Sequence, residues 1–388
     1  MTIYVTFFDI MNYICYKGVF ILNKILLNGL HYESHGAGIS KYTHMLLKTF
    51  IEENYDVDIL IRDEFAENLF SQNVIYANQN INGSKNRIIY EQLKAQRLYK
   101  SYDLIHFPDY ATPVLYKGKK IATIHDMAMY TMRDKYTKMQ VITKETLLKN
   151  TVKNSDRLIC DSEFSKNELI RYYPEAEEKA IVVYCGIEIP KLEIESKFEI
   201  DTLEKYDIQK NNYILYVGTI APQKNIANLI KAYVLARHNG LECKLVIAGK
   251  KGWMYDEIFK YVSETKMEEN IIFTDYINDL ELEILYKNAK IFSTISLYEG
   301  FGFPPLEAIG RNVPVLLSDI EIFKEICGDS ALYCNPFDVQ NISDNMLKLI
   351  SDEALQAQLK LNGKQRLKMF NWNKTAKDIF DIYLDVLK

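Results

Sequence analysis

Cysteine is scarce and scattered in this sequence of 388 residues, at Cys15, Cys160, Cys185, Cys243, Cys327 and Cys334. No Cys-x-x-Cys pair occurs, and no histidine follows a cysteine at the spacing of a zinc site. The spacing therefore argues against both a disulfide framework and a structural zinc site. Reduced thiols favour a cytoplasmic protein.

The sequence also lacks an excess of positive charge and a long apolar run. Its 47 basic and 52 acidic side chains give a net charge of −5, which does not indicate a nucleic-acid partner. Asp9 and Asn12 interrupt the apolar segment Met1–Asn23, which has neither the basic start and cleavage site of a signal peptide nor the length of a membrane span. We interpret residues 1–23 as an N-terminal extension, with a membrane anchor as the alternative.

What the sequence does have is a regular alternation of segments from Lys24 onward. Short runs of Ile, Val and Leu alternate with longer amphipathic segments, which is typical of buried parallel strands joined by helices. Two successive sets of such units indicate an α/β protein with two doubly wound, Rossmann-like domains facing across a cleft. We predict an N-terminal domain at 24–190, a linker at 191–211, a C-terminal domain at 212–372 and a final helix at 373–388.

The segment Ser296–Ala308 is the most informative part of the chain. Its surroundings predict a strand at Ala289–Ile295 and a helix from Pro305, so that a glycine-rich loop leads from a strand into a helix N-terminus. Backbone N–H groups at such a point bind anions, and Glu299 and Glu307 nearby can hold hydroxyl groups. This combination indicates a sugar nucleotide. Two alternatives stay open: Glu307 as an ordinary helix N-terminal acid, and both acids as the pair of a glycosidase.

Two further loops in the second half of the chain suit a phosphate ligand. Gly218 and Thr219 end a predicted strand, and Lys224 stands at the start of the next helix, where its charge adds to the helix dipole. Gly249 and Lys250 end the following strand. The other interpretation is that Lys224 is a solvated surface residue and that the second loop is a plain turn.

The first half of the chain has two comparable positions. Gly36 and Gly38 follow the first predicted core strand and permit close approach to a ligand, with Ser40 as the expected helix cap. His125 and Asp126 follow a buried strand, where a neutral imidazole can donate to a substrate and Asp126 can orient the ring or hold the loop. A plain turn and a structural histidine are the alternatives.

The run Glu299-Gly-Phe-Gly-Phe-Pro-Pro-Leu-Glu307 resembles the Glu-x7-Glu motif of retaining glycosyltransferases of family 4, which have the GT-B fold. The resemblance covers nearly the whole chain after the extension. Besides the loops above it includes residues 155–165 and Phe370-Asn-Trp372. It implies the two-domain GT-B fold, with the last helix, about residues 375–387, crossing back onto the first domain.

The resemblance also implies roles for individual residues. Glu299 would bind hydroxyl groups of the donor sugar, Lys224 would bind the donor diphosphate, and His125 would face the transferred sugar; these three are the expected catalytic residues. Gly36 and Gly38 would lie near the donor phosphate and the acceptor. The expected donor-binding residues are Glu307, for the ribose hydroxyls, and Gly218, Thr219, Gly249, Lys250, Gly300, Phe301, Gly302 and Phe303.

One departure from the family pattern concerns the diphosphate. Many members have arginine where this chain has Thr219, and others have arginine where it has Gln223. Without these arginines, Lys224 and the helix dipoles would have to balance the negative charge of the diphosphate.

We therefore expect an enzyme that moves a hexose from a nucleotide-diphosphate sugar to a glycan or lipid-linked acceptor in surface polysaccharide synthesis. The loops at 219–225 and 249–253 look most like those of mannosyltransferases that use GDP-mannose. No metal, no cofactor besides the donor and no nucleic-acid partner are expected, and the resemblance implies peripheral contact with the inner membrane face. The alternatives are another GT-B enzyme, such as a nucleotide-sugar epimerase or a sugar phosphorylase, and a non-catalytic sugar-nucleotide-binding protein.

Overall fold

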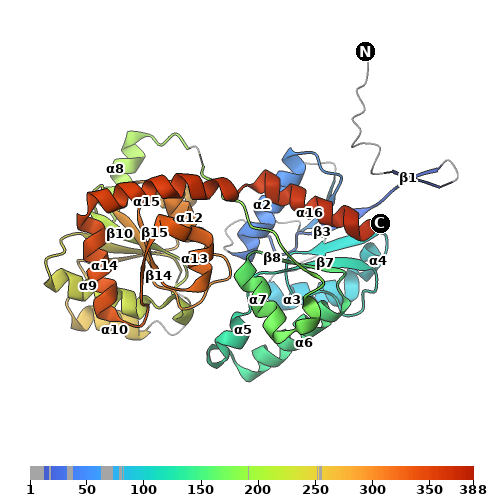
Figure 1. Cartoon of the computed structure of the whole chain (residues 1–388), viewed down its shortest axis with the longest axis horizontal. Helices are drawn as coiled ribbons and strands as arrows, with labels where there is room; N and C mark the ends of the chain where they lie inside the picture. The colour runs from blue at the N-terminus through green and yellow to red at the C-terminus, as the bar shows by residue number, and fades with distance from the viewer. Residues whose placement is uncertain are drawn as a thin grey trace, which may run out of the picture. The chain divides into compact units, whose positions relative to one another are not determined.

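The computed structural model describes residues 13–16, 19–32, 38–62, 73–77, 81, 83–190, 192–250, 252 and 256–388. The chain divides into two compact units (Figure 1): unit 1 holds residues 1–186 and 372–388, and unit 2 holds residues 187–371. Each unit is a parallel sheet flanked by helices, which is the α/β architecture that the sequence predicts. The domain and linker bounds given above stay a prediction.

The sheet of unit 1 has the strand order β5-β4-β3-β6-β7-β8-β9, and neighbouring strands run parallel. Its strands are β3 (Ile25–Asn28), β4 (Asp58–Ile61), β5 (Val74–Tyr76), β6 (Leu104–Phe107), β7 (Lys119–Ile124), β8 (Arg157–Cys160) and β9 (Ala180–Val182). Every residue of β3 and β6 is buried, as a parallel sheet covered on both faces requires. Before this sheet, β1 (Tyr13–Tyr16) and β2 (Val19–Leu22) pair antiparallel within the predicted extension.

The helices of unit 1 include a π-helical segment and the C-terminal helix. They are α2 (Ile39–Glu52), α3 (Gly83–Ile89), the π-helix η2 (Tyr90–Lys94), α4 (Gln96–Tyr99), α5 (Ala128–Thr131), η3 (Arg133–Lys135), α6 (Lys138–Asn154), α7 (Glu163–Tyr172), η4 (Pro174–Ala176) and α16 (Trp372–Leu387). α16 packs against α2 and β6, and Tyr383 OH lies 2.6 Å from His106 Nδ1. The C-terminal helix is thus part of unit 1 (Figure 1).

The sheet of unit 2 has the strand order β12-β11-β10-β13-β14-β15, again with parallel neighbours. Its strands are β10 (Tyr213–Val217), β11 (Lys244–Ala248), β12 (Ile271–Asp275), β13 (Ile291–Thr294), β14 (Val315–Ser318) and β15 (Ala331–Cys334). Because β11, β10 and β13 are adjacent, the loops that follow them emerge at one edge of the sheet.

The helices of unit 2 connect these strands and cover the sheet. They are α8 (Ser196–Lys205), η5 (Pro222–Lys224), α9 (Ile226–His238), α10 (Asp256–Glu264), α11 (Asp279–Asn288), α12 (Phe303–Gly310), α13 (Glu321–Cys327), η6 (Gly328–Ser330), α14 (Val339–Ser351), α15 (Glu353–Arg366) and η7 (Leu367–Met369). α9 and α14 pack against each other and bury Leu229, Tyr233 and Met346 in the core around β10 and β11.

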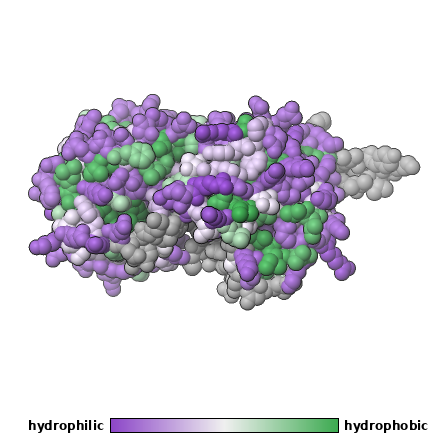
Figure 2. Space-filling model, turned by 90° about the horizontal axis from the view of Figure 1, so that it is seen from below, coloured by the Kyte–Doolittle hydropathy of each residue, from purple (hydrophilic) through white to green (hydrophobic). Residues whose placement is uncertain are grey.

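Some large apolar side chains remain exposed in the described parts of the chain, among them Leu93, Leu115, Met139, Ile142 and Phe337. Figure 2 shows one face of the molecule, on which apolar patches lie between hydrophilic side chains. Within the same parts, no helix combines the length and the apolar character needed to span a bilayer.

One helix, α8, lies inside the predicted linker range 191–211, where the weak apolar pattern of a charged segment gives no helix signal. One helix start differs from the sequence prediction. α12 begins at Phe303, two residues before the predicted start, because Gly302 takes φ 101° and redirects the chain there.

Candidate functional site

Three loops meet at the carboxyl edge of the unit 2 sheet, where β10, β11 and β13 end. Ile220 N donates to Lys250 O at 3.0 Å, which joins the loops after β10 and β11. Leu297 N donates to Gln223 O at 2.8 Å, which joins the loops after β13 and β10. The loops that the sequence singles out in unit 2 therefore form one continuous surface, at the edge where open α/β sheets bind ligands.

The side chains of Lys224 and Glu299 meet on this surface. Lys224 Nζ lies 2.7 Å from both carboxylate oxygens of Glu299. Asn225, with φ 53°, separates η5 from α9, and its Nδ2 donates to Pro336 O at 2.8 Å, which fixes the turn that carries Lys224. The side chains of Lys224 and Glu299 are 23% and 16% exposed, and Gly300 is also partly exposed, so a ligand can reach them.

A chain of hydroxyl groups fixes the position of Glu299. Ser296 Oγ donates to Glu299 Oε1 at 2.7 Å, and Thr294 Oγ1 lies 3.2 Å from Ser296 Oγ. Ser318 Oγ, at the end of β14, donates to the carbonyl of Ser296 at 2.5 Å. These three residues are not among those that the sequence predicts. The signal available in the sequence is that β13 and β14 are apolar strands with hydroxyl residues at their carboxyl ends.

Glu307 is more enclosed than Glu299. The residue is 6% exposed, and Tyr286 OH on α11 donates to its Oε2 at 2.9 Å. Burial, together with the charge of Glu307, raises the pKa of Tyr286 well above its ordinary value, so this phenol stays a proton donor. Glu307 lies in the second turn of α12, beyond the reach of the dipole at the first turn, so the interpretation as an ordinary N-terminal acid loses support.

The first turn of α12 offers few backbone donors to an anion. Gly302 is the N-cap, and Pro304 and Pro305, which follow Phe303, carry no N–H. With two of the four N-terminal N–H groups missing, this terminus binds an anion less strongly than an ordinary helix N-terminus. The buried Phe301 packs against Phe303, with ring centroids 5.0 Å apart, and stiffens the loop.

Contact between the loops after β10 and β11 requires a glycine at position 249. Gly218 and Gly249 have φ 149° and 154°, and a Cβ on Gly249 would lie 2.1 Å from the carbonyl oxygen of Gly218. Thr219 and Lys250 are exposed at this edge, and Lys250 Nζ lies 4.7 Å from the ring centroid of Tyr276. Packing between the loops thus explains Gly249 without reference to a ligand.

His125 follows β7 in unit 1, and its surroundings keep it protonated. Its Nδ1 lies 2.5 Å from Asp161 Oδ2, and its Nε2 donates to Pro108 O at 3.1 Å. Burial lowers the pKa of His125, but the charge and the hydrogen bond of Asp161 outweigh burial and raise this pKa to about 9. The expected neutral imidazole is therefore wrong. Asp161 orients the ring, whereas Asp126 accepts from Ala128 N at 2.9 Å and holds the loop.

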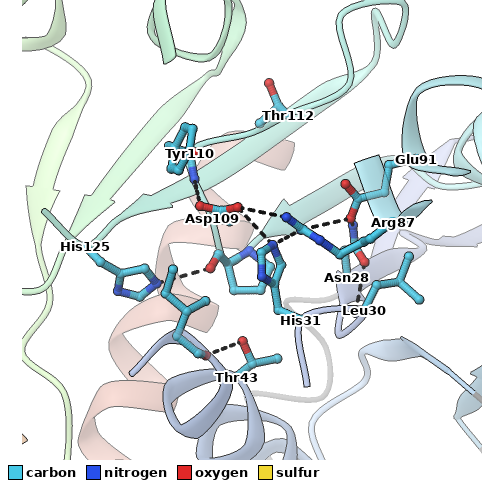
Figure 3. Close-up of polar contacts among 12 residues, drawn as sticks. Asn28, Leu30, His31, Thr43, Arg87, Glu91, Asp109, Tyr110, Thr112 and His125 are labelled. Carbon is cyan, nitrogen blue, oxygen red and sulfur yellow. Dashed lines mark hydrogen bonds and ion pairs between the residues drawn. The ribbon is translucent and has the colours of Figure 1, made fainter. Parts of the chain in front are cut away.

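A buried charged cluster lies beside His125 at the same edge of the unit 1 sheet (Figure 3). Arg87 Nη2 lies 3.3 Å from Asp109 Oδ2, and Arg87 Nη1 lies 3.4 Å from Glu91 Oε1 on η2. His31 Nε2 contacts Arg87 and lies 3.0 Å from Asp109 Oδ2. Asn28 Nδ2, at the end of β3, donates to Glu91 Oε1 at 2.9 Å. The sequence does not predict this cluster.

The cluster is connected to His125 through the backbone that directly follows β6. Asp109 directly follows Pro108, whose carbonyl accepts from His125 Nε2. Burial raises the pKa of the Asp109 carboxyl, but His31, Arg87 and His125 outweigh it and hold that pKa well below its ordinary value. The cluster therefore carries an ionised Asp109 next to the guanidinium of Arg87.

The glycine loop of unit 1 is described only from Gly38 onward, so Gly36 lies outside the described residues. Gly38 is the N-cap of α2 with φ 58°, and its carbonyl accepts from Tyr42 N at 3.0 Å. Ser40 is not the cap that the sequence predicts, because α2 already begins at Ile39 and Ser40 is buried inside its first turn.

No group of three or more His, Cys, Asp and Glu side chains in the described parts of the chain is arranged to hold a metal ion. The described cysteines Cys160, Cys185, Cys243, Cys327 and Cys334 are unpaired thiols. The expectation of a reaction without metal or further cofactor stays a prediction.

Comparison with known proteins defines the class. Residues 199–366 match the family described as "Glycosyl transferases group 1", and residues 36–190 match "Glycosyltransferase Family 4". O-antigen chain mannosyltransferase B of Escherichia coli is 30% identical over 296 residues, which are 75% of this chain and 76% of that protein. O-antigen chain mannosyltransferase RfbU of Salmonella typhimurium is 30% identical over 217 residues, which are 56% of each chain. The chain belongs to the group 1 and family 4 glycosyltransferases.

Solved structures share its fold. Sucrose-phosphate synthase from Thermosynechococcus elongatus has a TM-score of 0.74 at 19% identity, covering 94% of this chain and 99% of that one. Anabaena HepE in complex with UDP and glucose has a TM-score of 0.72 at 16% identity, covering 93% and 99%. WaaG, a glycosyltransferase involved in lipopolysaccharide biosynthesis, has a TM-score of 0.70 at 15% identity, covering 92% and 99%. The expected GT-B fold is confirmed.

Proposed function

We propose that this glycosyltransferase moves mannose, or a related hexose, from a nucleotide-diphosphate sugar such as GDP-mannose to a glycan or lipid-linked acceptor, with retention of the anomeric configuration. The names of the two O-antigen mannosyltransferases support a step in surface polysaccharide synthesis. The observation that carries the proposal is the contact of Lys224 with Glu299 at the carboxyl edge of the unit 2 sheet.

Lys224 is proposed to bind the donor diphosphate. Its ammonium is partly exposed, and a diphosphate offers more negative charge than the single carboxylate that Lys224 contacts now. Breaking the sugar–phosphate bond puts further charge on the leaving group, so a fixed cation there lowers the barrier to reaction. Because Thr219 and Gln223 stand where related enzymes have arginine, we propose Lys224 as the main side-chain cation at this position.

Glu299 is proposed to accept hydrogen bonds from hydroxyl groups of the transferred sugar once Lys224 has turned to the diphosphate. The hydrogen bond from Ser296 Oγ at 2.7 Å would keep the carboxylate oriented after that exchange. Glu307 is proposed to bind the ribose hydroxyls, with Tyr286 holding its Oε2. Both carboxylates then accept hydrogen bonds from hydroxyl groups of the donor, and neither serves as a nucleophile or a general acid.

Retention without an enzyme nucleophile requires that the acceptor attack on the face from which the phosphate departs. The bond from the anomeric carbon to the phosphate oxygen breaks, and a bond from that carbon to the acceptor oxygen forms. The acceptor proton passes to the phosphate oxygen of the departing nucleoside diphosphate. A contact between His125 and the sugar stays a prediction, as does contact of the protein with the inner membrane face.

A panel of nucleotide sugars tests the proposal. GDP-mannose is expected to protect the protein against thermal unfolding more than UDP-glucose does, and release of GDP is expected to require an acceptor. An epimerase would change the donor without an acceptor, a phosphorylase would need inorganic phosphate, and a non-catalytic binding protein would show protection without turnover. Absence of protection by every nucleotide sugar would contradict the proposal.

A further inference from the structure

A cavity of about 270 Å³ lies at the edge of the unit 2 sheet opposite to the Lys224 and Glu299 side chains. It is lined by segments that precede β10, β13 and β14 and by α15. Lys287 lies on α11, Lys290 directly precedes β13, Arg311 lies before β14, and Lys360 lies on α15. Since the donor loops follow the carboxyl ends of the same strands, the cavity is separate from the proposed donor site.

The charged side chains that line the cavity are all basic, in a protein whose net charge is −5. In the described parts of the chain, Lys287, Lys290 and Lys360 form no ion pair. The opposing charges are Glu283, which is paired with Arg311, and the C-termini of α11 and α12, each equivalent to about half a negative charge. Glu199 also interacts with Lys287, but Lys210, 3.2 Å from Glu199, balances its charge. The four cations therefore leave an excess of about two positive charges at this cavity.

Arg311 supplies the cavity with a fixed donor. Its side chain is 8% exposed; Nε and Nη2 bind Glu283 Oε2 at 2.8 and 2.5 Å, and Nη1 binds Glu307 O at 2.9 Å. A guanidinium has five N–H groups, and these contacts use three of them. One N–H on Nη1 and one on Nη2 are not accepted by any described residue. A planar cation held in this way suits recognition of a phosphate oxygen.

We propose that this cavity is a second anion site, which binds a phosphate group through Arg311 and the ammonium groups of Lys287, Lys290 and Lys360. The volume of about 270 Å³ is below the roughly 300–1,000 Å³ of sites for drug-sized ligands, so it suits a phosphate group and not a whole nucleotide sugar. The phosphate can belong to a small soluble molecule or to a lipid headgroup. The proposal does not depend on the proposed function.

Calorimetric titration with inorganic phosphate at constant ionic strength tests the site. The Lys224→Ala protein is used throughout, so that phosphate binding at the donor loops does not contribute. Saturable binding is expected, and adding Lys287→Gln with Lys290→Gln is expected to weaken it at least tenfold. The matched control, Lys231→Gln with Lys260→Gln, removes two exposed lysines of α9 and α10 in the same unit and should leave the affinity unchanged. No saturable binding, or equal weakening by both pairs, overturns the proposal.

Vesicles then separate the two sources of phosphate. Sedimentation with phosphatidylcholine vesicles that contain phosphatidic acid, lost in the Lys287→Gln/Lys290→Gln protein and absent with phosphatidylcholine alone, identifies a lipid headgroup. Binding of inorganic phosphate without sedimentation identifies a soluble phosphorylated ligand. Sedimentation that the Lys287→Gln/Lys290→Gln substitutions leave unchanged, together with no binding of inorganic phosphate, overturns the site.

Discussion

Lys224 Nζ lies 2.7 Å from both carboxylate oxygens of Glu299, so the two residues proposed to bind the diphosphate and the sugar of one donor form an ion pair with each other. Both side chains are partly exposed, and such pairs contribute only about 0–1 kcal/mol to folding. Exchange of partners on donor binding therefore costs little. The ion pair holds both side chains at the edge of the sheet, and each of them can still exchange its partner for the donor.

Lys224→Met is expected to lower kcat/KM for sugar transfer by about 10²–10³-fold, because it removes the cation proposed to stabilise the leaving diphosphate. The free energy of unfolding should change by no more than about 1 kcal/mol, as for an exposed ion pair. Steady-state kinetics and urea unfolding measure the two effects. Lys260→Met, on the exposed face of α10, is the control. Activity that falls only in proportion to lost stability would contradict the assignment.

Tyr286→Phe is expected to raise the Kd of the nucleotide sugar by roughly tenfold, because Glu307 loses the hydrogen bond that holds its carboxylate in position for the ribose hydroxyls. Calorimetry measures the affinity. Tyr213→Phe is the matched control, since this buried phenol donates to the carbonyl of Leu285 at 2.6 Å and has no carboxylate partner. It should reduce stability and leave the Kd unchanged; an equal effect of both substitutions on Kd would refute a role of Glu307 in binding.

The contact of His125 with Asp161 is expected to make stability depend on pH. The pKa of His125 is raised from 6.5 to about 9, so the folded state holds the proton more tightly than the unfolded chain. The resulting stabilisation, about 3 kcal/mol, is fully present below pH 6.5 and is lost as the pH rises through 9. Urea unfolding at pH 6 and pH 9.5 measures it. Asp161→Asn should remove most of this difference; the same difference in both proteins would show that other groups cause it.

Gly249→Ala is expected to destabilise unit 2 and to weaken donor binding, because the new Cβ would lie 2.1 Å from Gly218 O and separate the loops after β10 and β11. Gly240→Ala is the control: this glycine also has a positive φ, of 95°, but no atom lies within 4 Å of its Cβ position. Gly249→Ala should lower the free energy of unfolding by about 1–3 kcal/mol more than the control does, as expected for overpacking. Thermal unfolding and donor titration check both effects, and equal losses would contradict the packing argument.

The features that the sequence predicts are those set by residues close together in the chain. β10, β11 and β13 are apolar runs that each end in a loop with glycine, and Lys224, Glu299 and Glu307 lie in or directly after such loops. A parallel sheet places the carboxyl ends of neighbouring strands together, so their proximity follows from the fold class.

The parts that the sequence does not predict depend on partners far apart in the chain. His125 is oriented by Asp161, which is 36 positions away and directly follows the next strand, β8, rather than by its neighbour Asp126. Arg87 on α3 meets Asp109, 22 positions later, only because α3 lies beside the segment that follows β6. In the sequence, each of these side chains resembles an ordinary charge on the surface. Only the structure shows that it is buried and paired.

The configuration of the product tests the central claim most directly. The protein is incubated with GDP-α-mannose and a mannose-terminated acceptor, and proton NMR of the new anomeric signal identifies the linkage. We expect an α-linked product that forms with the native protein and is strongly reduced with Glu299→Gln and Lys224→Met. A β-linked product, or transfer that both substitutions leave undiminished, would contradict the claim that these residues hold the donor of a retaining glycosyltransferase.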